Sequence, residues 1–405
     1  MGDATPPQTR TRLERWQLIG GATLMSAALA AYEIVPASVT PIIRDSLGVS
    51  GTAVGFLVGI MFGTAMVVSL PVGFVLDRQN SRRAILLAVL IALGAGVFGW
   101  LAGQRGEYWP LVGSRIVGGA AYTVVWNAGI DIVGRAAGGR RATAVGVFTA
   151  SGPIGFAVGQ GAGPFIAVEY GWPAIFLVFT GIPVVGLALF WRASRGLGQT
   201  TGTPPSPAEL VRVIRDPDII SIGLLGFLGY GLYLFVNSWG ATYLTEDLGL
   251  ALEVSGLIVA VFPAVGVVAR TASGPISERL FAGRRRPVVV GSFLVAAPIL
   301  LLFTRLESIG VLILALFTAG FAIQTTLGLS FTYVQELVGP RVAATAVAFQ
   351  TSVSLAGAFL APTIAGGAIE RWGFEPAFLG AGALAIAGVA VAYRMPKPSR
   401  AAGSR

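Results

Sequence analysis

The sequence predicts an all-α, polytopic membrane protein in which twelve spanning helices form two related six-helix bundles. Three observations predict this fold class: an apolar composition, long runs without charge, and a repeat that relates the two halves of the chain. Of the 405 residues, 54% are hydrophobic and only 12% are charged, and the mean hydropathy is +0.77. A soluble domain is rarely so apolar. Whole segments such as 84–103 carry no charge, and such runs are long enough to span hydrocarbon.

Twelve apolar runs follow one another, each about 18 to 27 residues long, which is a spanning length. They begin near residues 17, 53, 84, 109, 142, 173, 219, 253, 287, 309, 343 and 374. We expect helices, because a lipid-facing segment must satisfy its backbone hydrogen bonds internally, whereas barrel strands would alternate in polarity. The first run is too long and too interrupted by polar residues for a signal peptide.

The basic residues are distributed unevenly between alternate loops. Of 28 Lys and Arg residues, 22 lie on the side of the N-terminus, four lie on the other side, and two (Arg115 and Arg270) fall within spans. Cytoplasmic loops carry this excess of positive charge. The pattern therefore predicts a multi-pass protein of the cell membrane with both termini in the cytoplasm.

The longest polar connection, residues 194–218, divides the chain into an N-terminal bundle (residues 1–193) and a C-terminal bundle (residues 219–405). We expect this linker to be cytoplasmic and to contain a short helix lying at the inner surface, with Ser206 as its N-cap and Glu209 at position N3.

The two halves repeat each other at an offset of about half the chain. The matched segments are Gly73-x-x-x-Asp77-Arg78 with Gly274-x-x-x-Glu278-Arg279, Thr143-Ala144-Val145 with Thr345-Ala346-Val347, and Tyr170-Gly171-Trp172 with Trp372-Gly373-Phe374. Six-span halves related in this parallel way are a known transporter plan.

The chain has no cysteine and no histidine. This excludes disulfides, zinc sites of the Cys/His kind, Ser-His-Asp triads and haem ligation by histidine. A nucleotide loop of the Walker kind is also missing. Because the basic residues lie in short loops and not on one solvated face, no nucleic-acid partner is predicted. We expect a protein without enzyme activity, cofactor or metal, in which any proton chemistry uses carboxylates.

The loop between the second and third spans reads Gly73-Phe-Val-Leu-Asp77-Arg78-Gln-Asn-Ser-Arg82-Arg83. It resembles the signature of the major facilitator superfamily: a glycine, then Asp-Arg, then a basic pair. The usual second glycine is replaced near Asn80, and the basic pair falls one residue late. The resemblance covers essentially the whole chain, and it implies a transporter whose halves rock around a site near mid-membrane.

In that family the motif holds the halves together at the cytoplasmic side in the outward-open state. We expect Asp131 to be a partner for Arg82, and Glu278 and Glu336 to be partners for Arg284 and Arg285. The alternative reading of these arginines is positive-inside topology alone. The candidate cytoplasmic gate residues are Gly73, Asp77, Arg78, Arg82, Asp131, Glu278, Arg279 and Glu336.

The fourth span contains Gly113-Ser114-Arg115-Ile-Val-Gly118-Gly119, which is similar to the family's fourth-span motif of an arginine followed by glycine. Burying an arginine at mid-membrane costs about 2.5 to 3.5 kcal/mol on insertion scales. One alternative is a side chain that snorkels to the surface. Tyr122 and Trp126 continue the same helix face, so we expect a polar and aromatic stripe that lines a cavity.

Glu33, in the first span, is the only carboxylate well inside an apolar run, and its depth is close to that of Arg115. We expect a salt bridge between the two side chains, which substrate arriving at Arg115 would break so that Glu33 takes a proton. The alternative is a static structural ion pair, although ionisable groups inside a membrane are functional by default.

The fifth span carries Gly155-x-x-x-Gly159-x-x-x-Gly163-Pro164, which resembles the glycine-proline motif linked to antiporters in the superfamily, with Ala167 and Val168 in place of the terminal glycines. Small residues at this spacing are more often plain helix packing than a coupling device.

In the second half, Asn237 and Gln324 are candidate substrate contacts, because amides in hydrocarbon need a partner. Tyr230 and Tyr233 share a helix face with Asn237, where packing is an equally good explanation. Arg270 has no counterpart in the first half. Its surroundings resemble the eighth span of superfamily carriers for small organic anions, where the arginine meets a carboxylate; the alternative is a side chain that reaches water at the inner interface.

Two transport functions remain open. The first is a proton-coupled carrier for a small anion, with Arg115 and Arg270 as attracting charges and Glu33 as proton carrier. The second is a proton-driven exporter of multiple drugs or lipophilic cations, in which Glu33 binds the cation or the proton. A non-transporting membrane sensor with the same fold is a third alternative. The expected partners are the lipid bilayer, a small-molecule substrate and a proton.

Overall fold

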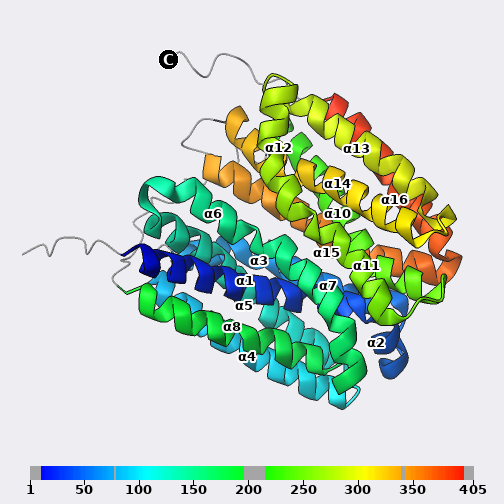
Figure 1. Ribbon diagram of the computed structural model, residues 1–405, viewed down its shortest axis with the longest axis horizontal. Coiled ribbons are helices and arrows are strands. Elements are labelled where there is room, and N and C mark those ends of the chain that lie inside the picture. Colours follow the sequence, from blue (N-terminus) through cyan, green and yellow to red (C-terminus); the bar gives the residue numbers. More distant parts are fainter. Residues whose placement is uncertain (1–10, 77–78, 196–214, 339–342, 396–405) are drawn as a thin grey trace, which may run out of the picture.

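The structure, a computed structural model, describes residues 11–76, 79–195, 215–338 and 343–395 (Figure 1). Within these ranges the chain is helical, without strands, and twelve segments are long and apolar enough to cross a membrane. The predicted all-α class with twelve spans is therefore confirmed. The helix expected at Ser206 lies outside the described residues, as do Asp77 and Arg78 of the cytoplasmic motif.

The N-terminal bundle is built around α1, which packs against α5, α7 and α8, while α4 packs against α5 and α8. A helix that was not predicted, α2, connects α1 to α3 at the end of the molecule opposite the N-terminus, which we call the outer end. The elements are α1 (Arg12–Ser38), α2 (Thr40–Leu47), α3 (Gly51–Leu76), α4 (Ser81–Gln104), α5 (Tyr108–Ala136), η1 (Gly138–Arg140), α6 (Arg141–Thr149), α7 (Ser151–Tyr170) and α8 (Ala174–Ala193).

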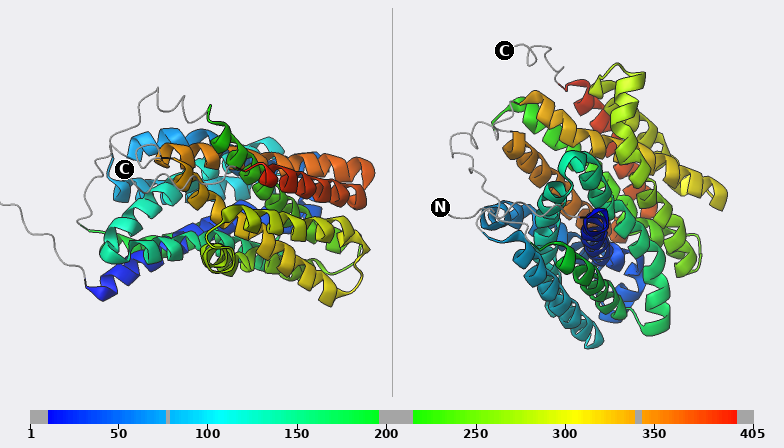
Figure 2. Two further views of the ribbon diagram at one scale, coloured as in Figure 1. Left: turned by 90° about the horizontal axis from the view of Figure 1, so that it is seen from above. Right: turned by 60° about the vertical axis from the view of Figure 1, so that its left-hand side comes forward.

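The C-terminal bundle repeats this plan around α10, which packs against α11, α14, α15 and α16. Its helices lie beside those of the first bundle, as the views in Figure 2 show. The elements are α10 (Pro217–Glu246), α11 (Leu252–Ala264), α12 (Gly266–Leu280), α13 (Arg285–Leu302), η2 (Phe303–Arg305), α14 (Ile309–Leu337), α15 (Ala343–Trp372) and α16 (Phe374–Tyr393).

The fifth and eighth spans are each divided into two helices, and a proline accounts for each break. Proline lacks the N–H that its i−4 carbonyl would accept. Pro153 follows the break between α6 and α7, and Pro263 precedes the break between α11 and α12. Both breaks lie near the middle of their spans, where the two bundles face each other.

The bundles meet on their outer halves through backbone contacts that only glycine permits. A Cβ on Gly55 of α3 would lie 2.1 Å from the carbonyl oxygen of Pro362 in α15, and one on Gly366 would lie 2.3 Å from the carbonyl oxygen of Gly51. Similarly, a Cβ on Gly256 of α11 would lie 2.5 Å from the carbonyl oxygen of Gln160 in α7. Close approach of small residues is how helices pack inside a membrane. Two sides of the interface are therefore sealed near the outer surface.

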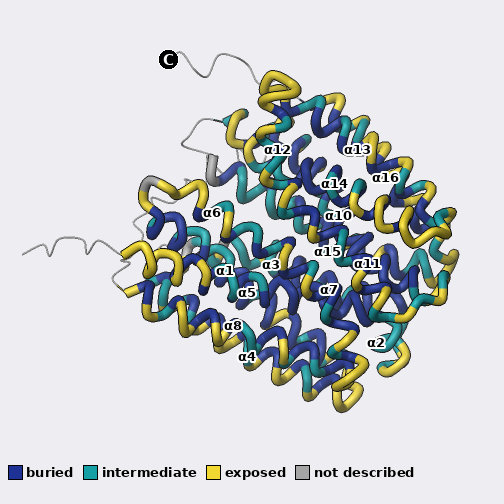
Figure 3. The backbone as a smooth tube through the Cα atoms, viewed as in Figure 1, coloured by how far each residue is buried: buried dark blue, intermediate teal, exposed yellow. Residues whose placement is uncertain are grey.

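The inner halves differ. Gly73 in α3 and Gly274 in α12 face open space, with no atom within 4 Å of an added Cβ. Buried residues gather instead around α7, α11 and α15, toward the end of the molecule that carries α2 (Figure 3). Residues on the periphery, such as Leu87, Leu314 and Ile364, are large, apolar and more than half exposed, as expected for lipid-facing positions. The structure is thus closed on its outer side.

Candidate functional site

Glu33 lies in α1 at the interface with the opposite bundle and is only 6% exposed. It interacts electrostatically with Tyr122 of α5 and with Tyr233 of α10. Among the described residues, its carboxylate takes part in no ion pair. The carboxylate also interacts with the charge of Arg115, although no ion-pair contact joins the two side chains. A titratable group therefore sits between the two bundles.

Arg115 is fully buried, and its guanidinium is occupied by the backbone of two neighbouring helices. It donates to the carbonyl oxygens of Tyr32 (2.6 Å) and Glu33 in α1, and to that of Leu57 in α3 (3.4 Å). The predicted salt bridge to the Glu33 carboxylate is wrong, since the contact is to the backbone of that residue. The snorkelling alternative is also wrong, because the side chain stays 0% exposed.

Pro36 explains why Arg115 binds this part of α1. Without an N–H at position 36, the carbonyl of Tyr32 loses its i−4 donor. A buried carbonyl without a donor is costly, and the guanidinium fork supplies two donors to successive carbonyls. The ring of Tyr32, 4.7 Å below the guanidinium carbon, covers the charge. Arg115 therefore joins α1, α3 and α5 in this conformation, through three of the five N–H donors of its guanidinium.

Arg270 of α12 differs from Arg115 in that its guanidinium is not held by backbone carbonyls of the described residues. Its guanidinium carbon lies 5.7 Å from the centre of the Tyr233 ring, and its Nε is buried without a hydrogen-bond partner. It forms no ion pair with any described residue. Arg270 and Glu33 share the neighbours Tyr122 and Tyr233. The two charges therefore belong to one site, one from each bundle.

Aromatic rings from both bundles stack beside these charges. Tyr233 of α10 lies between Phe156 of α7 (5.4 Å, 20° between planes) and Phe262 of α11 (5.6 Å, 24°). Tyr230 meets Tyr233 edge to face at 6.4 Å, and Trp126 meets Tyr122 in the same way at 6.3 Å. The ring stack therefore bridges the two bundles near the middle of the spans.

The two predicted amides are both fully buried. Asn237 donates to the carbonyl oxygen of Tyr233 (2.8 Å), and its backbone carbonyl accepts from Gln160 of α7. Gln324 donates to the carbonyl oxygens of Phe262 (2.9 Å) and Pro263 (3.3 Å), next to the break between α11 and α12. Asn237 thus lies at the interface between the bundles, whereas Gln324 supports a helix break within one bundle. A substrate contact at either residue stays a prediction.

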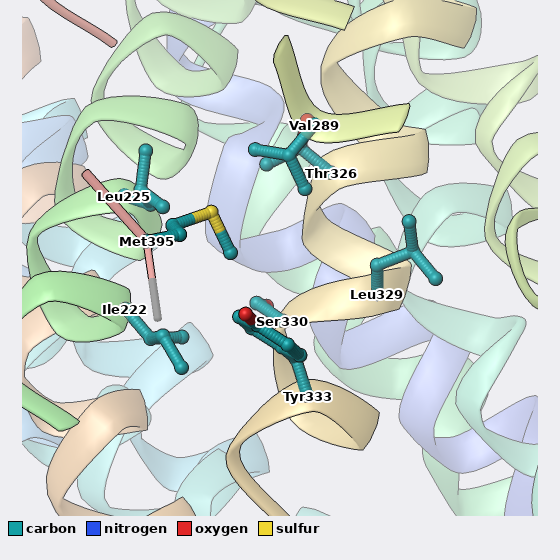
Figure 4. Close-up of a pocket in the computed structure, with 8 residues that line it drawn as sticks. All are labelled: Ile222, Leu225, Val289, Thr326, Leu329, Ser330, Tyr333 and Met395. Atoms are coloured by element: carbon teal, nitrogen blue, oxygen red, sulfur yellow. The ribbon is translucent and has the colours of Figure 1, made fainter. Parts of the chain in front are cut away.

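Two hollows outside this site have different characters. The first, in the inner part of the C-terminal bundle, has a volume of about 10 Å³ and is closed by Met395 against Leu225 and Thr326 (Figure 4). It has room for about one water molecule. The second, about 350 Å³, opens at the outer surface beside Arg44 and Glu246.

A profile described as the Major Facilitator Superfamily matches residues 21–362 of the chain. The chain belongs to this superfamily. Its resemblance to the superfamily signature is therefore confirmed, and the protein is a multi-pass membrane transporter by family.

Some relatives of this superfamily member are named as transporters, and others are named as membrane sensor proteins. The "Probable L-galactonate transporter" of Escherichia coli (strain K12) is 26% identical over 427 aligned residues, covering 95% of this chain and 90% of that protein. The "Hexuronate transporter" of Bacillus subtilis (strain 168) is 23% identical, covering 64% of this chain and 66% of that protein. A solved bacterial homolog of the human lysosomal transporter Spinster, inward-facing and occupied, has a TM-score of 0.79 at 17% identity, covering 95% of this chain and 97% of that chain.

The superfamily motif at the cytoplasmic side pairs differently from the prediction. Arg82 donates to the carbonyl oxygen of Trp191 (2.8 Å) and to the hydroxyl of Ser194 (3.1 Å) at the C-terminus of α8. Asp131 instead pairs with Arg135, one turn further along α5, at 2.5 Å. The expected Arg82–Asp131 pair is thus wrong, because the free carbonyls at the end of α8 attract the cation at the start of α4.

In the second half, Arg285 pairs with Glu336 (2.8 Å) and with Glu278 (3.6 Å), as expected for that arginine. Arg284 is the exposed N-cap residue of α13 and takes part in neither pair. Arg279 is also exposed. All of these contacts stay within one bundle, and a gating role for these residues remains a prediction.

The glycines of the fifth span pack α7 against α1. A Cβ on Gly155 would lie 2.2 Å from the carbonyl oxygen of Ala27, one on Gly159 would lie 2.9 Å from that of Ala31, and one on Gly163 would lie 2.5 Å from the Ser38 hydroxyl. Pro164 in turn contacts the position of Gly256 in the opposite bundle. The packing explanation of this motif therefore accounts for its residues.

Sequence reasoning did not single out Phe156, Gln160 or Phe262. Gln160 carried a usable signal, since it is the lone amide in an otherwise apolar span and stands between two glycines. Phe156 and Phe262 gave no such signal in the sequence, because an aromatic ring in an apolar run is as often in contact with lipid as with another ring.

Proposed function

We propose that the chain is a proton-coupled carrier of a small carboxylate, with Arg270 as the anion-binding group and Glu33 as the proton carrier. The observation that carries the proposal is the uncommitted guanidinium of Arg270 at mid-membrane. An arginine at this depth is expensive to bury and is retained for a partner. Its planar fork suits a carboxylate, which it binds with two parallel hydrogen bonds.

Glu33, which lies in the bundle opposite Arg270, supports coupling of solute movement to proton movement. When a solute anion occupies Arg270, the pair is nearly neutral, and a proton on Glu33 removes the remaining negative charge. The loaded site then crosses from one side to the other as the bundles rock. Arg115, with its donors held by α1 and α3, acts in this scheme by positioning the segment of α1 that carries Glu33.

The class of carboxylate to test first is the sugar acids. Two of the relatives, an L-galactonate transporter and a hexuronate transporter, are named for sugar acids, whereas others are named for sugar efflux and for fosmidomycin resistance. Their solutes are carboxylates, which agrees with the charge of Arg270. The ring stack of Phe156, Tyr233 and Phe262 adds an apolar wall against which the carbon chain of such a solute would rest.

The experiment is uptake of labelled hexuronate or aldonate into proteoliposomes under an imposed pH gradient. Arg270→Gln should abolish uptake, Arg270→Lys should retain part of it, and Arg140→Gln is the control, because Arg140 is exposed at the inner surface. Glu33→Gln should abolish pH-driven accumulation while exchange of labelled for unlabelled solute continues. Accumulation by Glu33→Gln equal to that of the unmodified protein would exclude the coupling assignment.

A second function, export of lipophilic cations, draws on one observation: Glu33 forms no ion pair with a described residue and lies near Tyr122 and Tyr233. A cation would meet a carboxylate and aromatic faces there. The two functions respond differently to Arg270→Gln, which should stop an anion carrier and leave a cation exporter nearly unchanged. Measurable uptake of either kind would also exclude a non-transporting sensor.

The membrane placement belongs to the same proposal. We infer that the protein crosses the cell membrane with both termini in the cytoplasm, and that residues 194–218 join the two bundles there. Because the chain has no cysteine, single cysteines report sidedness directly. Arg83→Cys should react with an impermeant maleimide only in opened cells, and Arg105→Cys should react in intact cells; the reverse pattern would invert the topology.

A further inference from the structure

Two buried amides at the interface between the bundles have an unsatisfied oxygen each. Gln160 of α7 and Asn237 of α10 are both 0% exposed. Gln160 Oε1 and Asn237 Oδ1 have no hydrogen-bond partner among the described residues. Buried polar atoms are nearly always paired, so an unpaired one in a native structure calls for an explanation.

The position of this amide pair relates it to the proposed site. Gln160 lies one helical turn beyond Phe156, and Asn237 lies one turn beyond Tyr233, the two residues whose rings stack across the interface. One turn advances roughly 5.4 Å along a helix. The amides therefore lie on the outer side of the ring stack, about one turn from it, while Arg270 lies against the same tyrosine.

The amide pair is also a contact between the bundles. The Gln160 side chain donates to the backbone carbonyl of Asn237, and a second contact, Arg44 with Glu246 at 2.7 Å, joins the bundles at the outer surface. Any motion that parts the bundles on the outer side must break both. The amide groups then become the polar atoms that an arriving solute meets on its way to the ring stack.

We propose that Gln160 and Asn237 recognise hydroxyl groups of the solute when the outer side is open, and so select hydroxylated acids over plain carboxylates. Their free oxygens are acceptors, and a hydroxyl is a donor that also accepts from the amide nitrogen. Arg270 binds the carboxylate end, and the amides bind the hydroxylated chain. The inference rests on the proposed function, since it assigns the remainder of the same solute.

The two residues allow a matched comparison. Gln160→Leu removes an acceptor and also the hydrogen bond between the bundles. Asn237→Leu removes an acceptor and a hydrogen bond to the Tyr233 carbonyl within α10, but it keeps the hydrogen bond between the bundles, because Gln160 bonds to the backbone of residue 237. Gln350→Leu is the control for loss of a buried amide, since Gln350 is 0% exposed but packs against Gly226 inside the C-terminal bundle.

The experiment is calorimetric binding of gluconate and of hexanoate to the purified full-length chain and its variants. Gluconate should bind more tightly than hexanoate. Gln160→Leu and Asn237→Leu should each weaken gluconate binding about tenfold, the value of one hydrogen bond, and leave hexanoate unchanged. Gln350→Leu should leave the ratio of the two affinities as it was.

Three results would overturn the inference. In the first, the affinity ratio is unchanged in both interface variants. In the second, Gln160→Leu alters both acids alike while Asn237→Leu alters neither, which identifies a contact between bundles and nothing more. In the third, the unmodified protein binds neither acid, which removes the proposed function as well. Should Gln160→Leu fail to fold, Asn237→Leu decides the question, because it keeps the hydrogen bond between the bundles.

Discussion

The ion pair between Arg44 and Glu246 joins the two bundles at the outer surface, and Arg44→Gln should shift the protein toward its outward-open state. Arg44 belongs to α2, and Glu246 is the last residue of α10. The contact is bidentate, with N–O distances of 2.7 and 3.3 Å. Burial lowers the pKa of Arg44, but the hydrogen bonds and negative charges of Glu246 and Asp45 together raise it by more, so the net direction is upward. The guanidinium therefore stays charged at every pH of a transport assay, and only a substitution removes it.

The exposure of the pair sets the size of the effect. The two side chains are 33% and 27% exposed, so solvent screens much of their attraction. Exposed pairs are worth about 0.2 to 1 kcal/mol, with good bidentate geometry at the upper end. A loss of about 1 kcal/mol changes an equilibrium about fivefold. We therefore expect the ratio of outward-open to outward-closed molecules to rise by up to about fivefold in Arg44→Gln, and by less in Arg44→Lys.

The assay is a distance measurement between two spin labels in the cysteine-free chain. Glu107 and Glu307 are exposed outer residues, one in each bundle, and cysteines at these positions would carry the labels. The longer-distance population should grow in Arg44→Gln, and adding Glu246→Gln to the same chain should change it no further, since the pair is already broken. If the distance distribution of Arg44→Gln matched that of the unmodified protein, the ion pair would have no part in closing the outer side.

Three further predictions concern backbone contacts. Arg115→Leu should lower the midpoint of thermal unfolding in detergent, because each buried carbonyl left without a donor costs about 1 to 3 kcal/mol. In a Pro36→Ala background the Tyr32 carbonyl regains a donor, so the loss caused by Arg115→Leu should be smaller. Strictly additive losses would contradict the role of Pro36. Gly55→Ala should widen the Glu107–Glu307 label distance, since its Cβ would lie 2.1 Å from the Pro362 carbonyl oxygen; Gly94→Ala, which has open space around its Cβ, should leave the distance unchanged. Gly266→Ala should destabilise the C-terminal bundle, because its Cβ would lie 1.7 Å from Gln324 Oε1 and would displace the amide that holds the Phe262 and Pro263 carbonyls. Adding Gln324→Ala to the same chain should then cost little more thermal stability; a neutral Gly266→Ala would refute this role of Gln324.

Segment length and composition were enough to predict the spans, because crossing hydrocarbon demands about twenty apolar residues wherever the helix lies. The tenth, eleventh and twelfth spans begin at the predicted residues 309, 343 and 374. By contrast, α2 has eight residues and mixed polarity, so no hydropathy window could reveal it. The division of the eighth span depends on how Pro263 and Gly266 pack against Gln324, which is a contact between distant segments.

In the candidate site, too, the sequence predicts positions along a helix but not contacts between distant segments. Depth along a span can be counted, and so Glu33 and Arg115 were correctly placed near each other. The direction in which a side chain points from its helix, relative to a neighbouring helix, cannot be counted from the sequence. Successive residues of a helix point about 100° apart, so Tyr32 faces Arg115 while the Glu33 carboxylate lies on another side of α1. Pro36 held the missing information, since a proline in a buried helix creates a carbonyl that some donor must meet.

The break at Val265 is a hinge between α11 and α12, the two helices of the eighth span. Gln324 holds the carbonyls of Phe262 and Pro263 at the end of α11, whereas Arg270 lies one turn into α12, beyond that clamp. Phe262, whose ring stacks on Tyr233, and Arg270, the proposed anion-binding residue, therefore lie on separate helices of this span. A rotation of α12 about the break would move Arg270 while α11 stays packed against α7, and the glycine contacts at the outer end would not be disturbed.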